Sequence, residues 1–127
     1  MSPAELIHLA TEVRKKAFAP FSHFTVGAAV ANAQGDYAVG CNVENAAFGS
    51  TICAEADALS QAVAQGIEEI TNIAIVTETG AAPCGNCRQL IAQLAPNCHV
   101  HLASTAALQI RTLSIRELLP DAFTSLE

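Results

Sequence analysis

Three cysteines and one glutamate lie in two short stretches whose spacing suits metal chemistry. Cys53 stands two residues before Glu55, and Cys84 and Cys87 form a C-x-x-C pair that follows Pro83. Three thiolates can hold one zinc ion, and catalytic zinc sites keep a further position open for water. The spare carboxylate of Glu55 can then act as a general acid or base beside that position. The pattern predicts a zinc-dependent hydrolytic site.

Two other uses of the C-x-x-C pair stay open at this level. In a structural zinc site a fourth protein ligand closes the coordination shell, and His23 or Cys41 is the best candidate for it. In a thioredoxin-type site the pair is redox-active and lies between a strand and a helix, a context that is met here. Neither alternative explains Glu55, because neither needs a carboxylate beside the sulfurs. This favours the catalytic interpretation.

The two cysteine stretches both fall where a loop is expected to turn into a helix. Helix N-termini expose unpaired N–H groups and carry a partial positive charge. This environment lowers the pKa of a thiol and favours metal-bound sulfur. Cys84 and Cys87 are three residues apart, so they share one helical face. Two helix starts can therefore converge on one ion.

Hydrophobic periodicity and turn signals predict the elements that position these helix starts. The segment 70–77 is a nearly continuous β-branched run, which is typical of a central strand covered on both faces. Capping boxes begin the first and last helices at Ser2 and Ser114. We expect helices over 3–17, 52–65, 84–95 and 114–119, and strands over 25–32, 37–43, 70–77, 98–103 and 109–113.

The order of these elements is α-β-β-α-β-α-β-β-α, without repeats or linkers. It predicts one α/β domain over residues 1–127, a three-layer αβα sandwich with a mixed five-stranded sheet. Only a few residues join the last two strands, whereas a parallel connection needs a dozen or more. We therefore expect these two strands to pair antiparallel.

Composition restricts the partners. The chain has 12 acidic and 6 basic residues, a net charge of −6, and is 51% hydrophobic. Its one basic cluster, residues 14–16, lies near a helix end, where positive charge suits the dipole, so we expect no nucleic-acid partner. No apolar run approaches the ~20 residues of a membrane span, and the N-terminus lacks a signal-peptide pattern. We expect a cytoplasmic protein without a membrane segment.

Several ordered motifs resemble the cytidine deaminase family in its short, tetrameric form. The C-A-E stretch and the P-C-x-x-C stretch match the zinc deaminases of nucleobases. Segments 24–29, 40–46 and 117–123 resemble the same family, so the resemblance spans about residues 5–123. It implies the cytidine deaminase-like fold, one Zn²⁺ per subunit, and hydrolytic deamination of cytidine and 2′-deoxycytidine in pyrimidine salvage. It also implies a homotetramer whose active sites are completed by neighbouring subunits.

The resemblance implies individual roles as well. Cys53, Cys84 and Cys87 would bind zinc, and Glu55 would pass a proton from the attacking water to ring N3. The substrate contacts would be Phe24 and the Ala54 backbone at the base, Asn42 and Glu44 at the ribose hydroxyls, and Phe48 and Phe123 from neighbouring subunits. Without the family, Asn42 and Glu44 read as a solvated strand end and Phe24 as a core residue.

The chain departs from the family pattern at the residue after Glu55. An arginine is common there, whereas this chain has Ala56, which leaves Arg88 to hydrogen-bond the thiolates. Phe48 also stands where a tyrosine is common. These departures keep a second substrate class open, namely a modified cytidine or an antibiotic of the blasticidin S type. A non-enzymatic, zinc-stabilised subunit and a nucleic-acid editor are the remaining alternatives; Glu55 argues against the first and the acidic charge against the second.

Overall fold

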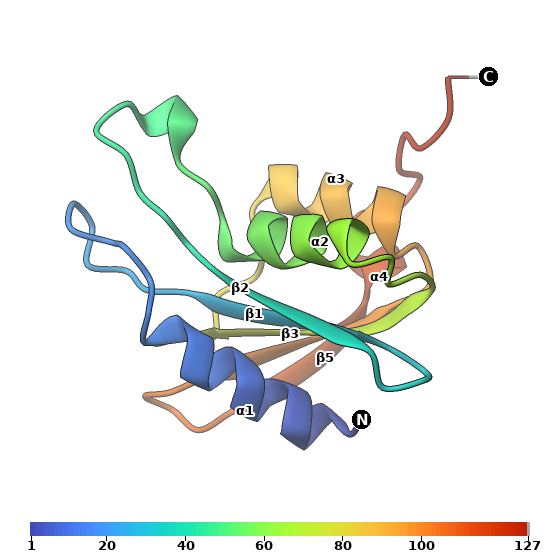
Figure 1. Ribbon diagram of the computed structural model, residues 1–127, viewed down its shortest axis with the longest axis horizontal. Coiled ribbons are helices and arrows are strands. Elements are labelled where there is room, and N and C mark those ends of the chain that lie inside the picture. Colours follow the sequence, from blue (N-terminus) through green and yellow to red (C-terminus); the bar gives the residue numbers. More distant parts are fainter. Residues whose placement is uncertain (127) are drawn as a thin grey trace.

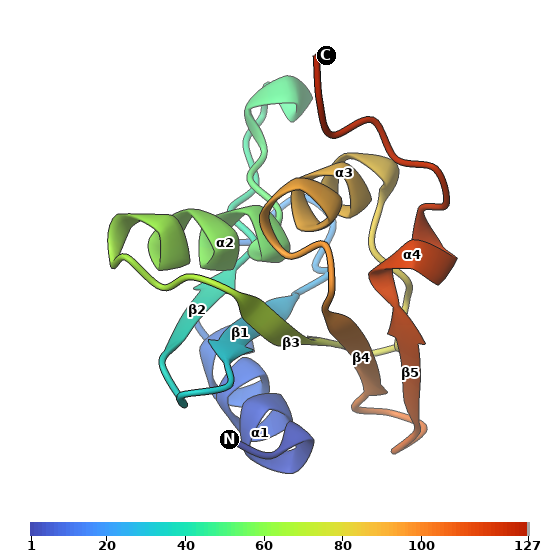
Figure 2. The ribbon, with the colours of Figure 1, turned by 90° about the vertical axis from the view of Figure 1, so that its right-hand side faces the viewer.

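The computed structural model describes residues 1–126 and arranges them in three layers (Figure 1). A five-stranded sheet in the order β2-β1-β3-β4-β5 forms the middle layer. Helix α1 covers one face, and α2, α3 and the short α4 lie on the other, as Figure 2 shows. The expected αβα sandwich is therefore confirmed. The elements are α1 (Pro3–Arg14), β1 (Gly27–Asn32), β2 (Tyr37–Cys41), η1 (Phe48–Ser50), α2 (Ala54–Ala64), β3 (Ile70–Thr77), α3 (Gly85–Leu94), β4 (His99–Ser104), β5 (Ile110–Ser114) and α4 (Ile115–Leu118).

The sheet is mixed. β1 pairs antiparallel with β2 and β3, and β3 pairs parallel with β4 through the crossover helix α3. β4 and β5 pair antiparallel, with His99 opposite Ser114, as their short connection requires. β3 lies at the centre of the sheet and is buried from Ile73 onward, which accounts for its continuous apolar sequence. Both expected capping boxes, at Ser2 and Ser114, are present.

Two glycines on neighbouring strands allow the helices to approach the sheet closely. A Cβ atom on Gly27 would lie 1.9 Å from the carbonyl oxygen of Ala10 in α1. On the opposite face, a Cβ atom on Gly40 would lie 2.4 Å from the backbone nitrogen of Ala58 in α2. The missing side chain at Gly40 thus sets the distance between β2 and the helix that carries Glu55.

Several element boundaries differ from the expected ones, and long-range contacts account for two of them. The first helix ends at Arg14, short of residue 17, since the chain turns and Phe18 forms a bridge with Val43. The first strand begins at Gly27 instead of residue 25, because the side chain of Asn42 bonds the preceding backbone. The expected loop over 44–51 contains a 3₁₀ turn, η1.

Candidate active site and metal centre

The three cysteines meet at the adjacent N-termini of α2 and α3. Cys53 is the N-cap of α2, and Cys84 is the N-cap of α3 with Cys87 in its first turn. The two helices run side by side on one face of the sheet (Figure 2). As a result the three Sγ atoms all lie within 4.8 Å of one another. The convergence expected from the sequence is thus present.

The geometry of this cluster fits a zinc ion. Zn–S bonds of ~2.3 Å in a tetrahedral arrangement place sulfur atoms a little under 4 Å apart, which suits the observed spacing. Within the described part of the chain, no further histidine, cysteine or carboxylate ligand atom joins the group, so neither His23 nor Cys41 closes it. Three thiolates leave one position free, which is the arrangement of a catalytic site.

The sulfurs influence one another's ionisation. Hydrogen bonding from the thiol of Cys87 lowers the pKa of Cys53 to about 6, against burial and the nearby Glu55 charge. The same interaction, together with burial, raises the pKa of Cys87. Both helix N-termini favour negative charge at the sulfurs. Cys53 therefore becomes a thiolate ligand more readily than Cys87.

Glu55 lies in the first turn of α2, beside the sulfur cluster, and its residue is only 5% exposed. Burial raises the pKa of its carboxyl group, while hydrogen bonds from its own backbone N–H and from Cys87 act against that shift. Among residues 1–126, no basic side chain offsets the effect of burial on this pKa. A raised pKa moves the titration of a carboxyl group toward the working pH, which favours a general acid–base role.

A cavity of about 230 Å³ opens onto Cys53, Cys84 and Glu55. Three of the expected substrate residues, Phe24, Asn42 and Ala54, line it. The other lining residues are Val26, Thr51, Ile75, Thr77, Ala81, Ala82 and Pro83, and no site role was expected for Ile75, Thr77, Ala81 or Ala82. The sequence does contain a signal for Thr77, because it is the hydroxyl residue that ends the central strand. Its Oγ1 accepts from the N–H groups of Gly80 and Ala81 and so shapes the loop before Pro83.

Asn42 is buried, and its amide group holds the backbone beside the cavity. Its Oδ1 accepts from the Val26 N–H at 2.9 Å, and its Nδ2 donates to the Phe24 carbonyl at 2.8 Å. The amide still has one N–H and one lone pair free. Asn42 therefore orients Phe24 and keeps one donor and one acceptor for a ligand in the cavity.

Glu44 lies outside the cavity lining, next to the loop that leads to Phe24. Its carboxylate accepts hydrogen bonds from the backbone N–H groups of Phe21 and Ser22 and from the Ser22 hydroxyl. The bonds with Ser22 hold the pKa of Glu44 below its ordinary value. Glu44 is thus a fixed carboxylate at the side of the site, not a solvated strand end.

The two aromatic residues expected from neighbouring subunits do not line the cavity of their own chain. Phe48 in η1 is 82% exposed, and Phe123 in the C-terminal segment is 66% exposed. The carbonyl of Phe123 accepts a 2.6 Å hydrogen bond from Gln89 of α3, which fixes the backbone at that point. Both rings therefore project from the surface of a single chain.

Arg88 contacts carbonyl oxygens in place of sulfur. Its Nε donates to the carbonyl of Pro83 at 2.8 Å, and its Nη1 donates to the carbonyl of Leu118 at 2.9 Å. The side chain therefore ties α3 to the loop before Cys84 and to the end of α4. In a single chain, the two helix N-termini place partial positive charge at the sulfurs.

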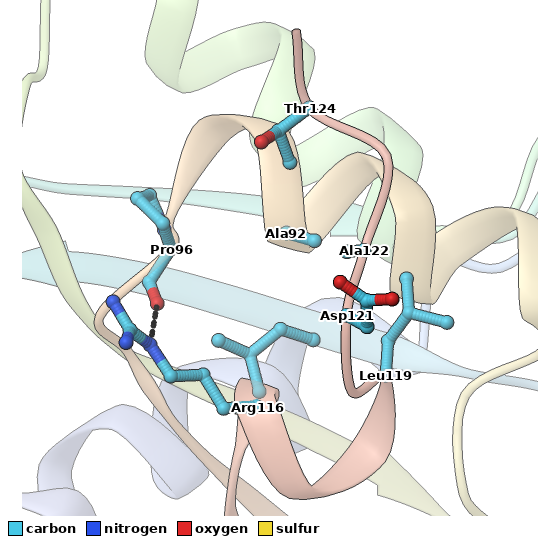
Figure 3. Close-up of a pocket in the computed structure, with 8 residues that line it drawn as sticks. Ala92, Pro96, Arg116, Leu119, Asp121, Ala122 and Thr124 are labelled. Atoms are coloured by element: carbon cyan, nitrogen blue, oxygen red, sulfur yellow. Dashed lines mark hydrogen bonds between the residues drawn. The ribbon is translucent and has the colours of Figure 1, made fainter.

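A second cavity, of about 240 Å³, lies apart from this chemistry, between α3, α4 and the C-terminal segment (Figure 3). Arg116 and Asp121 contribute its charged groups. The Arg116 Nε donates a long, 3.4 Å hydrogen bond to the carbonyl of Pro96 at its edge. None of the cysteines lines it. The sulfur cluster and Glu55 mark the first cavity as the candidate active site.

Comparison with known proteins identifies the family. The model of the cytidine and deoxycytidylate deaminase zinc-binding region matches residues 2–102. The chain belongs to the cytidine and deoxycytidylate deaminase family. A cytidine deaminase from Halalkalibacterium halodurans is 41% identical over 123 residues, which cover 94% of this chain and 92% of that protein. The family's zinc region includes all three cysteines and Glu55.

Solved structures of deaminases share the same fold. The crystal structure of cytidine deaminase from Burkholderia pseudomallei superposes with a TM-score of 0.91 at 44% identity, covering 97% of this chain and 100% of the other. A blasticidin-S deaminase from Bacillus cereus is a further relative, 32% identical over 130 residues that cover 94% of this chain and 91% of that protein. The relatives of this chain are thus named for two different substrates, cytidine and blasticidin S.

Proposed function

We propose that this chain is a zinc-dependent hydrolase that converts cytidine and 2′-deoxycytidine to uridine and 2′-deoxyuridine, with release of ammonia. One observation carries the proposal: three cysteine sulfurs converge, and two of these cysteines line one cavity together with the buried carboxyl group of Glu55. The whole chain, residues 1–127, would form one domain of this kind. The 41% identity to a cytidine deaminase supports the substrate class.

The cysteines would hold the metal and Glu55 would move the protons. Zn²⁺ bound by Cys53, Cys84 and Cys87 supplies Lewis acidity, which makes water nucleophilic near neutral pH. Glu55 would take a proton from the attacking water and deliver it to ring N3 as the oxygen adds to C4. It would then take the remaining proton from the C4 hydroxyl and deliver it to the amino nitrogen, so that the C4–N bond breaks, the C4 carbonyl forms and ammonia leaves. The raised pKa of Glu55 suits both transfers.

The remaining residues of the site would bind and orient the nucleoside. Phe24 would pack against the base, and the Ala54 backbone would contact the ring. Asn42 has one donor and one acceptor free for a ribose hydroxyl, which can act as either. Glu44 can accept from a hydroxyl and cannot donate. Arg88 would support the site from behind by holding the Pro83 carbonyl.

The lining of the cavity favours nucleosides over nucleotides. No lysine or arginine is among its lining residues, and the titratable side chains there are Glu55 and two cysteines. A phosphate group needs positive charge or several N–H donors to replace its hydration. We therefore propose that deoxycytidylate is a poor substrate, and that nucleic acids, which require phosphate contacts, are not substrates.

We further propose a homotetramer in which neighbouring copies complete each cavity. The exposed rings of Phe48 and Phe123 support this, because large aromatic side chains at such exposure are typical of interaction surfaces. We propose a cytoplasmic location for this assembly. No helix among residues 1–126 is long and apolar enough to cross a bilayer. Light scattering of the purified protein would measure the mass of the particle.

The blasticidin-S relative makes deamination of that antibiotic the second candidate. The experiment is a substrate panel of cytidine, 2′-deoxycytidine, blasticidin S and 2′-deoxycytidine 5′-monophosphate, read by ammonia release. We expect turnover of the first two. Activity on blasticidin S alone would select the second candidate. Absence of turnover on every compound by zinc-loaded protein would favour a zinc-stabilised subunit without activity.

A further inference from the structure

The loop that carries Phe24 is bonded to the segment that carries Asn42 and Glu44. The N–H of Phe18 donates to the Asn42 carbonyl at 3.0 Å, and the N–H of Glu44 donates to the Phe18 carbonyl at 2.8 Å. The two segments therefore run side by side next to the cavity, which Phe24 and Asn42 line. Within this contact one small polar residue, Ser22, has no assigned role.

The loop that carries Phe21 and Ser22 occupies most of the hydrogen-bond acceptor positions of the Glu44 carboxylate. Its Oε1 accepts from the N–H groups of Phe21 and Ser22, at 3.0 and 3.1 Å. Its Oε2 accepts from the Ser22 hydroxyl. A carboxylate offers about four acceptor positions, so roughly one remains, and it lies on Oε2. The direction of that free position depends on the bond with Ser22.

The same hydroxyl also reaches Phe24. Ser22 Oγ accepts a 3.0 Å hydrogen bond from the N–H of Phe24 while it donates to Glu44. The intervening residue, His23, has a φ of 60°, a conformation that costs free energy in residues other than glycine. The His23 N–H donates to the Ala19 carbonyl at 3.0 Å, which closes the turn. The loop thus adopts an unfavourable backbone conformation that places one hydroxyl between two residues.

We propose that Ser22 is a positioning residue that fixes Glu44 and Phe24 relative to each other for recognition of the nucleoside. The inference rests on the proposed function, in which these two residues contact the ribose and the base. Ser22 itself touches neither the sulfur cluster nor Glu55 among its hydrogen bonds. Its loss therefore affects substrate binding and leaves the proton transfers in place.

Ser22→Ala removes the hydroxyl and both of its bonds. We expect its KM for cytidine to rise about tenfold, because one charge-assisted hydrogen bond is lost, while kcat changes by less than about threefold. Ser22→Thr keeps a hydroxyl and should restore KM. Ser60→Ala, on the exposed side of α2, is the matched control and should behave as wild type. Zinc content and circular dichroism would show whether each variant is folded.

A second substrate separates positioning from a general structural effect. 2′,3′-Dideoxycytidine lacks the ribose hydroxyls that Glu44 would bind, so the Ser22→Ala penalty should shrink to about threefold or less. An equal penalty on both nucleosides, a loss confined to kcat, or no change in KM would overturn the role of Ser22. Failure of wild type to deaminate cytidine would instead overturn the proposed function, together with the inference that depends on it.

Discussion

The guanidinium of Arg88 donates a 2.8 Å hydrogen bond to the carbonyl of Pro83, the residue immediately before Cys84. Its Nη1 bonds the carbonyl of Leu118, at the end of α4. One side chain therefore links the loop of the sulfur cluster to the C-terminal part of the chain. The planar guanidinium can serve two acceptors at once, whereas a lysine presents a single point charge.

Loss of the Arg88 link should affect both the loop before Cys84 and the end of α4. We expect Arg88→Ala to lower the free energy of unfolding by about 1.5–3 kcal/mol, because the carbonyls lose charge-assisted bonds. We also expect weaker zinc retention and faster proteolysis after residue 118. Denaturant unfolding, zinc analysis and limited proteolysis would measure these effects. Arg116→Ala removes the same charge from an exposed residue and is the control. Equal behaviour of the two variants would contradict the link.

Glu55→Gln keeps the size of the side chain and removes its acid–base function. We expect kcat for cytidine to fall by about 10²–10⁴-fold, while zinc content and assembly stay unchanged. Glu68→Gln, an exposed residue outside the cavity, is the matched control. Retention of more than a tenth of wild-type kcat by Glu55→Gln would show that another group moves the protons.

Removal of a sulfur should remove the metal. We expect Cys84→Ala to lose zinc affinity by more than the ~10–100-fold that follows loss of an outer-sphere partner. Cys98→Ala should keep its zinc, because Cys98 is buried in the core and is not part of the sulfur group. Chelation of the wild-type protein should abolish activity and added zinc should restore it. Equal zinc content in both variants would contradict the assignment of ligands.

Gly40→Ala tests the close approach of α2 to the sheet. The added Cβ would lie 2.4 Å from the Ala58 nitrogen, so the helix that carries Glu55 must move. We expect a loss of at least about 1–3 kcal/mol of stability, with a fall in activity. In Gly49→Ala the new atom meets nothing within 4 Å, which makes it the control. Thermal unfolding at fixed protein concentration compares the variants, and equal midpoints would refute the argument.

His101 should make stability depend on pH. It is buried, with Nδ1 2.9 Å from the Thr112 hydroxyl and Nε2 2.9 Å from Asn72 Oδ1. Because an amide oxygen only accepts, Nε2 carries a proton in this arrangement. Burial lowers the pKa of His101, and the nearby His99 adds to this shift.

The sign of the effect follows from proton binding. Below pH ~6.5 the unfolded chain protonates this ring, whereas the folded protein does so only at lower pH because the pKa of His101 is lowered. Stability therefore rises with pH across this window and is lost as pH falls through it, by at most ~1.4 kcal/mol per pH unit. Urea unfolding at pH 7.5 and 5.5 should show a smaller loss in His101→Gln than in wild type or His8→Gln. Equal losses in all three proteins would exclude His101 as the cause.

The ligands of the metal centre were predictable because each of the two cysteine stretches carries its own signal within a few residues of sequence. Cys53 and Cys84 stand at sequence positions that begin helices, and the spacing of Cys84 and Cys87 places them on one helical face. The central position of β3 was predictable for a similar reason, since burial on both faces leaves a continuous apolar run. Periodicity and capping depend on residues that are neighbours along the chain. The helix starts at the cysteines and the apolar run of β3 depend mainly on such neighbours.

The hydrogen-bonding partners of the polar residues were not predictable from such patterns. Arg88 was expected at the sulfurs and lies against two carbonyls, one of them 30 residues away in sequence. Asn42 holds the backbone of Phe24, 18 residues away, and Glu44 holds Ser22. A polar side chain satisfies its donors and acceptors with whatever the fold brings near. The sequence by itself therefore determined the sulfur cluster and its carboxylate, whereas only the tertiary structure decided which residues orient the groups around them.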